Sequence, residues 1–405
     1  MSALCKNCGA SLIFNPATQK VSCRSCGSAW EPEELEGSDT ASTSADADTP
    51  MPADRNRARQ KVYDCYVYTC KNCGGSILVT GSETSTTCAY CGSANVILSR
   101  FTKEKSPDYI LPFQFSKETA IRKIKEISEM RILVPDAFQN LDPESVHGIY
   151  VPYWLVNVHH AEAGVFQGEE GDGEDTRVYY YGRSASMKFT DLQIEASEAL
   201  DDVCTERLDV FDTTKMKPFH ENYLLGFYSD RSDIHFVNMR RAIRKKTLPL
   251  FTSYCLPTIR AMNKRLYKEE HETIIDKDIR YVLFPVWFVT VKYQNVDYTI
   301  LVNGESGKVA SVIPADQVTF RKWVFGGGLA IGFLSAVLAL IIRDYSGMSA
   351  SGSELTSLIT LSIIVTLILS TVFILLGKVL SHSIDKLNSV TQNPRAYKFT
   401  KKREG

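Results

Sequence analysis

Four Cys-x-x-Cys pairs, each followed by glycine, constrain the fold of this chain more than any other feature. They form two sets of equal spacing, with fourteen residues between the two pairs of each set. The second set repeats the first at an offset of 65 residues, and the neighbouring letters CKNCG and CGSA repeat with it. The first set is Cys5, Cys8, Cys23 and Cys26, and the second is Cys70, Cys73, Cys88 and Cys91.

This pattern predicts two four-cysteine metal sites. Two residues between cysteines allow one tight turn to direct both thiolates at one ion, with metal–sulfur distances of about 2.3 Å. The glycine after each pair suits a backbone with positive φ. Because sulfur fills all four positions, no position is left for a water molecule, which indicates structural rather than catalytic metals. We expect two Zn²⁺ ions per chain, although iron stays an alternative because four-cysteine sites hold either ion.

The other interpretation of paired cysteines is a disulfide framework. The chain begins Met1-Ser2-Ala3-Leu4-Cys5, with neither a basic nor an apolar region of a secretory signal. Residues 1–320 are therefore expected in a reducing cytosol, where disulfides are rare. Each set then predicts a small zinc ribbon whose folding depends on the metal. Cys65, Cys204 and Cys255 fit buried small side chains.

Composition divides the rest of the chain. The stretch 37–60 is small, acidic and poor in hydrophobic residues, which is typical of a flexible linker. The expected units are zinc ribbon 1 at 1–36, a linker at 37–64, zinc ribbon 2 at 65–100, a cytoplasmic α+β domain at 107–320, transmembrane helix 1 at 324–342, an external loop at 343–354, transmembrane helix 2 at 355–376 and a basic cytoplasmic tail at 377–405.

The transmembrane helices are predicted from two uncharged apolar runs. Val324–Ile342 and Leu355–Leu376 each have about the length needed to cross a ~30 Å hydrocarbon core. Basic residues flank the pair of runs and are scarce in Arg343–Glu354, so both termini are expected in the cytoplasm. Small residues recur every four positions in both runs. They fit either a packed helix hairpin or a homo-oligomer formed through these helices.

The middle region carries the signals of an α+β domain with a largely antiparallel sheet. A helix is expected to begin at Ser116 as N-cap, because isoleucines follow at helical spacing. Val151–Val158 resembles Phe284–Val291 through a shared Pro-x-Trp pattern, which indicates an internal duplication or two equivalent strands. Asn303–Gly304 predicts a hairpin turn. With the ribbons and the helix hairpin, the predicted class is an α+β multidomain membrane protein.

Several possible sites in this region have simpler explanations. His159 and His160 are neighbours on a predicted strand, so they point to opposite faces. The segment Asn303–Lys308 lacks the spacing of a phosphate-binding loop. The basic stretch Arg240–Lys246 suits either anionic lipid or a solvated helix face. No nucleophile–base motif is present in the sequence, so no enzyme activity and no catalytic residues are predicted.

Four short segments stand out beside the ribbons and the apolar runs: Ile110–Phe113, Tyr150–Trp154, Phe284–Phe288 and Val302–Val309. In these features the chain resembles a bacterial family of zinc-ribbon membrane proteins, often labelled TFIIB-type zinc-ribbon or primosomal-like proteins. Some relatives are encoded beside phage-shock protein A and SPFH-domain proteins. The resemblance implies a bacterial inner-membrane adaptor that recruits such partners at the inner leaflet during envelope stress. Two ribbons and a long linker depart from the family pattern.

Two functions are therefore weighed. The first is a non-enzymatic membrane adaptor that presents rigid hairpins and a larger domain to protein partners. The alternative is a membrane-tethered nucleic-acid-binding protein, which would need lysines and arginines to neutralise phosphates. Residues 1–36 carry three basic and four acidic residues (net −1), and residues 65–100 carry two basic and one acidic (net +1). Neither ribbon is a basic patch, so the charge pattern favours the adaptor over nucleic-acid binding.

Overall fold

The structure is a computed structural model of the 405-residue chain. It describes residues 4–35, 62–80, 87–130, 133–171, 173–197, 208, 210–232, 236–294, 296–311, 313–314, 316–345, 364, 368, 371–373, 375 and 377. The predicted linker at 37–64 lies almost entirely outside the described residues. The second apolar run, the loop before it and the basic tail do so as well.

Among the described residues, twelve strands form one large mixed sheet. Its main path runs β10-β7-β13-β8-β11-β5-β4-β6, with β14 and β15 added beside β13 and with β9 and β12 paired to β8. The pairs β7–β13 and β8–β11 are parallel, and the other pairs are antiparallel. The strands are β4 (Val62–Cys70), β5 (Ser76–Val79), β6 (Val96–Lys105), β7 (Tyr109–Ile110), β8 (Val146–Glu170), β9 (Arg177–Glu195), β10 (Lys217–Pro218), β11 (Tyr228–Ser229), β12 (Met262–Ile275), β13 (Arg280–Tyr293), β14 (Val296–Asn303) and β15 (Val309–Ser311).

A second, three-stranded sheet belongs to the first cysteine set. Its strands are β1 (Leu12–Asn15), β2 (Lys20–Cys23) and β3 (Ala29–Trp30), in antiparallel order β1-β2-β3. The hairpin expected around Asn15–Pro16 is confirmed, with Leu12 opposite Cys23. Short 3₁₀ turns connect the larger elements at η1 (Pro143–Ser145), η2 (Gly173–Asp175), η3 (Thr213–Lys215), η4 (Glu221–Leu224) and η5 (Leu256–Thr258).

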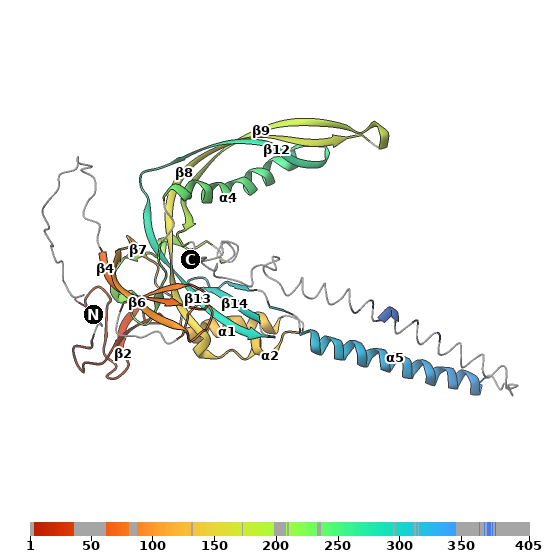
Figure 1. Cartoon of the computed structure of the whole chain (residues 1–405), viewed down its shortest axis with the longest axis horizontal. Helices are drawn as coiled ribbons and strands as arrows, with labels where there is room; N and C mark the ends of the chain where they lie inside the picture. The colour runs from red at the N-terminus through yellow and green to blue at the C-terminus, as the bar shows by residue number, and fades with distance from the viewer. Residues whose placement is uncertain are drawn as a thin grey trace.

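Strand β8 runs from the body of the molecule into a projecting arm (Figure 1). Its first residues are buried on both faces and pair with β13. Beyond Val158 buried and exposed side chains alternate, and the partner becomes β12. The change of partner from β13 to β12 occurs around Asn157, where the pairing of β8 with β9 also shifts register. Asn157 holds this junction, because its side chain accepts from the Asp191 N–H and its carbonyl from the Asp276 N–H.

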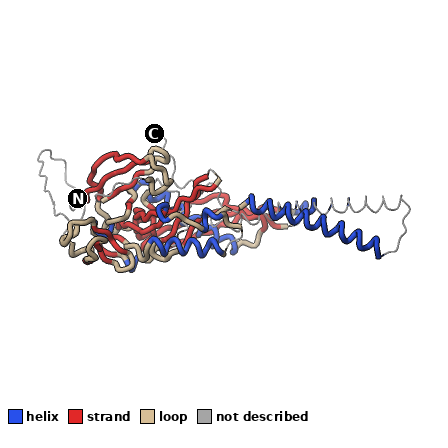
Figure 2. Tube along the Cα trace, turned by 90° about the horizontal axis from the view of Figure 1, so that it is seen from below, coloured by secondary structure: helices blue, strands red, loops and turns tan. Residues whose placement is uncertain are grey.

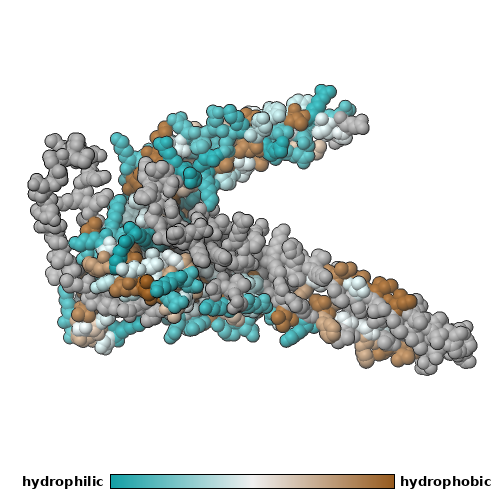
Figure 3. Space-filling model, in the orientation of Figure 1, coloured by the Kyte–Doolittle hydropathy of each residue, from teal (hydrophilic) through white to brown (hydrophobic). Residues whose placement is uncertain are grey.

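The arm consists of β9, β8 and β12, covered on one face by helix α4 (Phe236–Cys255). Near the body, Met239 and Ile243 of α4 pack against Val156, Val158 and Ile194. Further out, Phe251 and Cys255 pack with Phe166 and with residues that follow the helix. The other face is open, and the arm is largely hydrophilic on the side shown in Figure 3. Burial of one sheet face under one helix therefore stabilises an element that extends well beyond the main core.

The body packs its core on both faces of the sheet. Helix α1 (Lys117–Glu129) and helix α2 (Asp136–Gln139) cover one face through Ile124 and Phe138. The N-cap predicted at Ser116 is confirmed by position, although its side chain makes no capping hydrogen bond. The two Pro-x-Trp segments are adjacent antiparallel strands, because Tyr150 of β8 lies opposite Pro285 of β13.

Helix α5 (Gln317–Tyr345) extends away from the strands (Figure 2). It contains the first apolar run at 324–342. Within the part of the chain that the structure describes, however, no helix combines the length and the apolar character needed to cross a bilayer. The prediction of a transmembrane helix at 324–342, and with it the predicted transmembrane hairpin, is corrected on that finding; the second predicted helix, 355–376, lies mostly outside the described residues.

The predicted fold class is therefore wrong in two respects. The region after the first cysteine set is dominated by one large mixed sheet, which includes the strands of the second cysteine set, so this set is not a separate small ribbon beside another domain. The predicted transmembrane hairpin is the second error, because none of the helices in the described part of the chain is long and apolar enough to cross a membrane. The predicted location, a multi-pass protein of the bacterial inner membrane with both termini cytoplasmic, depended on those spans and is corrected with them.

Candidate metal centres

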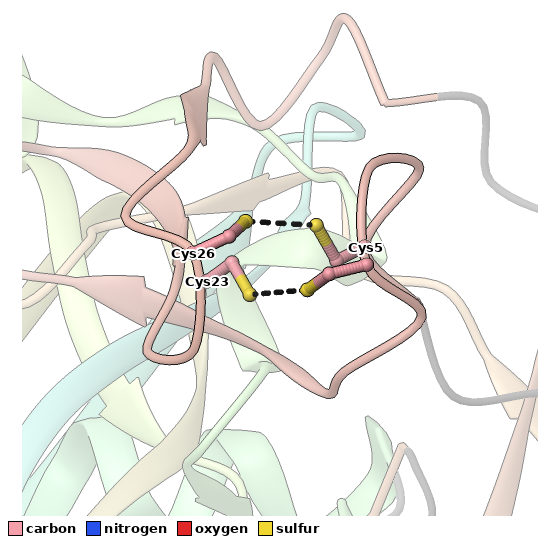
Figure 4. A group of neighbouring side chains, drawn as sticks. Cys5, Cys23 and Cys26 are labelled. Atoms are coloured by element: carbon pink, nitrogen blue, oxygen red, sulfur yellow. Dashed lines mark hydrogen bonds between the residues drawn. The ribbon is translucent and has the colours of Figure 1, made fainter.

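The first cysteine set forms a compact group of four thiols (Figure 4). The Sγ atoms of Cys5 and Cys26 are 3.5 Å apart, and those of Cys8 and Cys23 are also 3.5 Å apart. Four sulfurs at 2.3 Å from a tetrahedral ion would lie about 3.8 Å from one another. The observed spacing is close to that value, so the group can hold one metal ion.

The second set repeats this geometry. The Sγ atoms of Cys70 and Cys91 are 3.7 Å apart, as are those of Cys73 and Cys88. All four ligand atoms lie within 4.8 Å of one another. Both predicted four-cysteine groups are thus formed in the described residues, and each can bind a metal ion through four sulfurs.

Local backbone turns explain why each pair converges. Gly9 follows the first pair with φ of 74°, and its N–H donates to the Cys5 carbonyl at 2.8 Å. The same turn recurs after every pair, at Gly27, Gly74 and Gly92, each with positive φ. A side chain would be strained in this left-handed conformation. The glycines of the motif therefore permit the turn that directs two thiolates to one point.

Hydrogen bonds favour thiolate formation at one sulfur of each group. The Ser28 hydroxyl and backbone N–H bond to Cys26 and lower the pKa of its thiol to about 6. In the second group, hydrogen bonds from Cys73 and Cys88 lower the pKa of Cys91, and the Asn72 amide contributes. Since a metal binds thiolates and not thiols, Cys26 and Cys91 are the sulfurs best prepared for a metal, whereas the pKa values of the Cys8, Cys73 and Cys88 thiols are raised and these groups must release protons when a metal binds.

The three-stranded sheet of the first group is attached to the body. The Phe14 N–H donates to the Leu225 carbonyl at 3.0 Å, and the Gln19 amide donates to the Phe113 carbonyl at 2.7 Å. The Phe14 ring meets the Tyr223 ring edge-on, with 5.2 Å between centroids. The Asn222 side chain also donates to the carbonyls of Pro32 and Leu35. The first metal group is thus held against the body by several contacts.

The second group is part of the large sheet. Its strand β5 pairs with β11, which pairs in turn with β8. Tyr90, between Cys88 and Cys91, is 2% exposed and packs edge-on against Phe288 of β13, with 5.6 Å between ring centroids. The Thr290 hydroxyl donates to the Tyr90 carbonyl at 2.7 Å. These contacts therefore connect the second metal group to the central strands, and each is expected to stabilise the other.

The structure also shows where the single cysteines, the two adjacent histidines and the basic stretch lie. Cys65 and Cys255 are buried, as expected, and burial raises the pKa of the Cys65 thiol to about 12. Cys204 lies outside the described residues. His159 is exposed and His160 buried, which confirms opposite faces. In the basic stretch, Arg244 forms an ion pair with Glu269, and Lys246 donates to the Gln193 carbonyl.

Sequence reasoning missed a buried polar cluster under α4. His160 is fully buried; its Nδ1 lies 2.8 Å from the Thr273 hydroxyl and its Nε2 3.2 Å from Glu162. The Thr247 hydroxyl of α4 is also 3.2 Å from Nε2. The sequence feature that could have revealed this cluster is the two-residue spacing of His160 and Glu162, which places both side chains on the covered face of β8. Thr247 and Thr273 are far away in sequence and gave no such signal.

Comparison with known proteins identifies a relative but assigns no activity. No family model matches the chain. A protein of Bacillus subtilis (strain 168) that carries the name "Uncharacterized protein YdjG" is 26% identical over 351 residues, covering 84% of this chain and 98% of that protein. No solved structure matches. The chain is therefore similar, over most of its length, to a bacterial protein whose printed name gives no function.

Proposed function

We propose that this protein is a non-enzymatic adaptor whose two four-cysteine groups hold structural Zn²⁺ and whose projecting arm contacts a protein partner. The observation that carries the proposal is that the metal groups and the exposed arm are separate parts of the structure. Both metal groups are attached to the body, and every ligand position is supplied by sulfur. The arm extends away from them with one open sheet face (Figure 1).

Zinc in these groups would act on stability. A structural four-thiolate site contributes folding free energy directly, about 10–16 kcal/mol in zinc-finger peptides at neutral pH. The first group would hold the strands β1, β2 and β3 of the small sheet together, and the second would fix β4, β5 and β6 beside the central strands. The metals would thus make the body a rigid base from which the arm is presented.

The arm offers surface chemistry that suits a protein contact. Tyr180 of β9 and Tyr267 of β12 are 58% and 62% exposed, and their rings lie 5.3 Å apart, edge to face. Exposed tyrosines are enriched in protein interfaces because the ring gives contact area and the hydroxyl stays hydrated. Further along the arm, the open face of β8 carries the small side chains of Ala161 and Ala163, opposite Ser186 and Ser184 of β9. A flat floor of small residues beside paired tyrosines can receive another protein surface.

The proposed class of partner is taken from the resemblance of the sequence to the zinc-ribbon family. Phage-shock protein A-like and SPFH-domain proteins are the candidates, and envelope stress is the proposed context. The test is binding of the purified full chain to each purified candidate by biolayer interferometry. The variant Tyr180→Ser/Tyr267→Ser removes both rings, and Tyr254→Ser, which removes a tyrosine that is 84% exposed on α4, is the matched control.

The proposal predicts binding that is lost in the double variant and kept in the control. Equal binding by the double variant would remove the arm from the interface. Binding to neither candidate, combined with a salt-dependent shift of labelled DNA or RNA, would support the alternative of nucleic-acid binding. Two Zn²⁺ per chain, measured by inductively coupled plasma mass spectrometry, tests the metal part separately.

A further inference from the structure

Strand β6 ends the main path of the sheet and leaves one edge open. It pairs with β4 along its length from Val96 to Lys105, and no second partner strand pairs with it among the described residues. In an antiparallel pair, alternate residues direct their N–H and C=O groups away from the partner. A ten-residue edge of this kind is a template for an additional strand.

The edge is ordered by contacts at several points. At its start, the Lys71 N–H donates to the Asn95 carbonyl at 2.9 Å. In the middle, the Ser99 hydroxyl donates to that of Thr69 at 2.8 Å. At its end, the Lys105 ammonium lies 5.1 Å from the centre of the Trp154 ring. A prearranged edge loses little conformational freedom when a strand is added, which favours binding.

Apolar side chains on β6 are exposed to an unusual degree. Ile97, Leu98 and Phe101 have exposed fractions of 44%, 54% and 57%. Phe101 is positioned by Tyr66 of β4, with 5.2 Å between ring centroids. In Figure 3, brown and teal atoms lie together on the part of the body where Figure 1 draws β6. Proteins commonly protect long edges with bulges, proline or charges; here one register shift lies between Leu98 and Arg100, and the charged side chains are confined to the second half of the strand, from Arg100 to Lys105.

The charge at this edge is positive. Arg100 and Lys103 are exposed, and neither takes part in an ion pair within the described part of the chain. The one carboxylate of the strand, Glu104, is 16% exposed and already lies 3.3 Å from Arg231. It therefore does not neutralise the two cations, and Asp64 of β4, which lies opposite Lys103 in the register, forms no ion pair with it among the described residues. A ligand for this edge should bring both apolar and acidic side chains.

We infer that the open edge of β6 binds an extended peptide segment of another protein, with apolar and acidic side chains on both of its faces, as an added β-strand. Main-chain hydrogen bonds would supply affinity, while Phe101 and Lys103 on one sheet face and Arg100 on the other would select the sequence. A second copy of this chain fits less well, because its β6 would bring the same two exposed cations. The inference concerns a site on the body and is separate from the arm contact proposed above.

The experiment uses the full, zinc-loaded chain and three fluorescein-labelled eight-residue peptides. One repeats two valines and two glutamates, one repeats two valines and two lysines, and one is the acidic peptide with all of its backbone nitrogens methylated. The variant Arg100→Glu/Lys103→Glu reverses the edge charge. Arg177→Glu/Lys188→Glu, which reverses two exposed cations of β9, is the matched control. Fluorescence anisotropy reports binding, and circular dichroism verifies that both variants fold.

The inference predicts saturable binding of the acidic peptide by the natural chain and the control. Binding should weaken roughly tenfold in Arg100→Glu/Lys103→Glu, which corresponds to about 1.4 kcal/mol. That variant should gain affinity for the lysine peptide, and methylation should abolish binding in every case. Equal binding by both double variants, or by the methylated peptide, overturns the inference. A dimer of the natural chain that is lost in Arg100→Glu/Lys103→Glu would assign the edge to a second copy and overturn it too.

Discussion

Replacement of Tyr90 by alanine tests whether the second metal group and the large sheet form one cooperative unit. The change leaves all four cysteines in place but removes a ring that is 2% exposed and packs on Phe288. Truncation of a fully buried aromatic residue costs about 3–5 kcal/mol. That cost includes the loss of the edge-on ring pair, which contributes about 0.5–1.5 kcal/mol.

The assay is urea unfolding of the zinc-loaded chain, followed by tryptophan fluorescence, which senses Trp287 on the same strand as Phe288. With a urea dependence near 3 kcal/mol per molar, the expected loss moves the midpoint down by about 1–2 M. The control is Tyr90→Phe, which keeps the ring and should cost no more than about 1.5 kcal/mol. Zinc content should stay at two ions per chain below the transition.

A different result would refute the reasoning. If the second metal group were an autonomous ribbon, Tyr90→Ala would leave the tryptophan transition within about 0.5 kcal/mol of the natural chain. The metal would then be released in a separate, earlier step. One shared transition, with zinc release and tryptophan exposure at the same urea concentration, is what the contacts of Tyr90 with Phe288 and Thr290 require.

Three further predictions address the first metal group, the pH dependence and the packing. Cys5→Ser/Cys8→Ser should reduce zinc from two ions to one per chain by mass spectrometry, and a loss of both ions would contradict separate sites. Burial lowers the pKa of His147 from 6.5 to about 4, so the unfolded chain binds the proton first and stability should fall between pH 6.5 and 4, by on the order of 3 kcal/mol. Across that pH range the urea midpoint should change less in His147→Gln than in the natural chain. An equal change in both would exclude His147 as the cause of the pH dependence. Gly304→Ala would place a Cβ 2.7 Å from the Phe113 ring and 2.8 Å from Pro285, and should cost about 1–3 kcal/mol in thermal unfolding. Gly182→Ala, with nothing within 4 Å of its Cβ, is the control, and equal losses would count against the packing argument.

Local features of the chain were predictable from sequence. Both cysteine groups follow from spacing, because metal ligation and the glycine turns are decided within a few residues. The helix after Ser116 and the turn at Asn303–Gly304 follow for the same reason. The paired Pro-x-Trp strands were expected as equivalent elements and lie side by side.

Long-range features were not predictable. The second cysteine group joins the large sheet through β11, a two-residue strand at Tyr228–Ser229 that is too short to produce a pattern. The arm depends on pairing between β8 and β12, about one hundred residues apart in sequence, together with the cover of α4. Nothing in the alternation of β8 alone specifies which strand or helix completes that packing.

The continuity of β8 has a mechanical consequence. A 25-residue strand at about 3.3 Å per residue is roughly 80 Å long. A pulling force applied along it at Glu170 acts in shear, because the bonds to β9 and β12 must then rupture together rather than one after another. Tension at the arm tip would therefore be transmitted past Asn157 to the strands beside the second metal group before the arm itself yields.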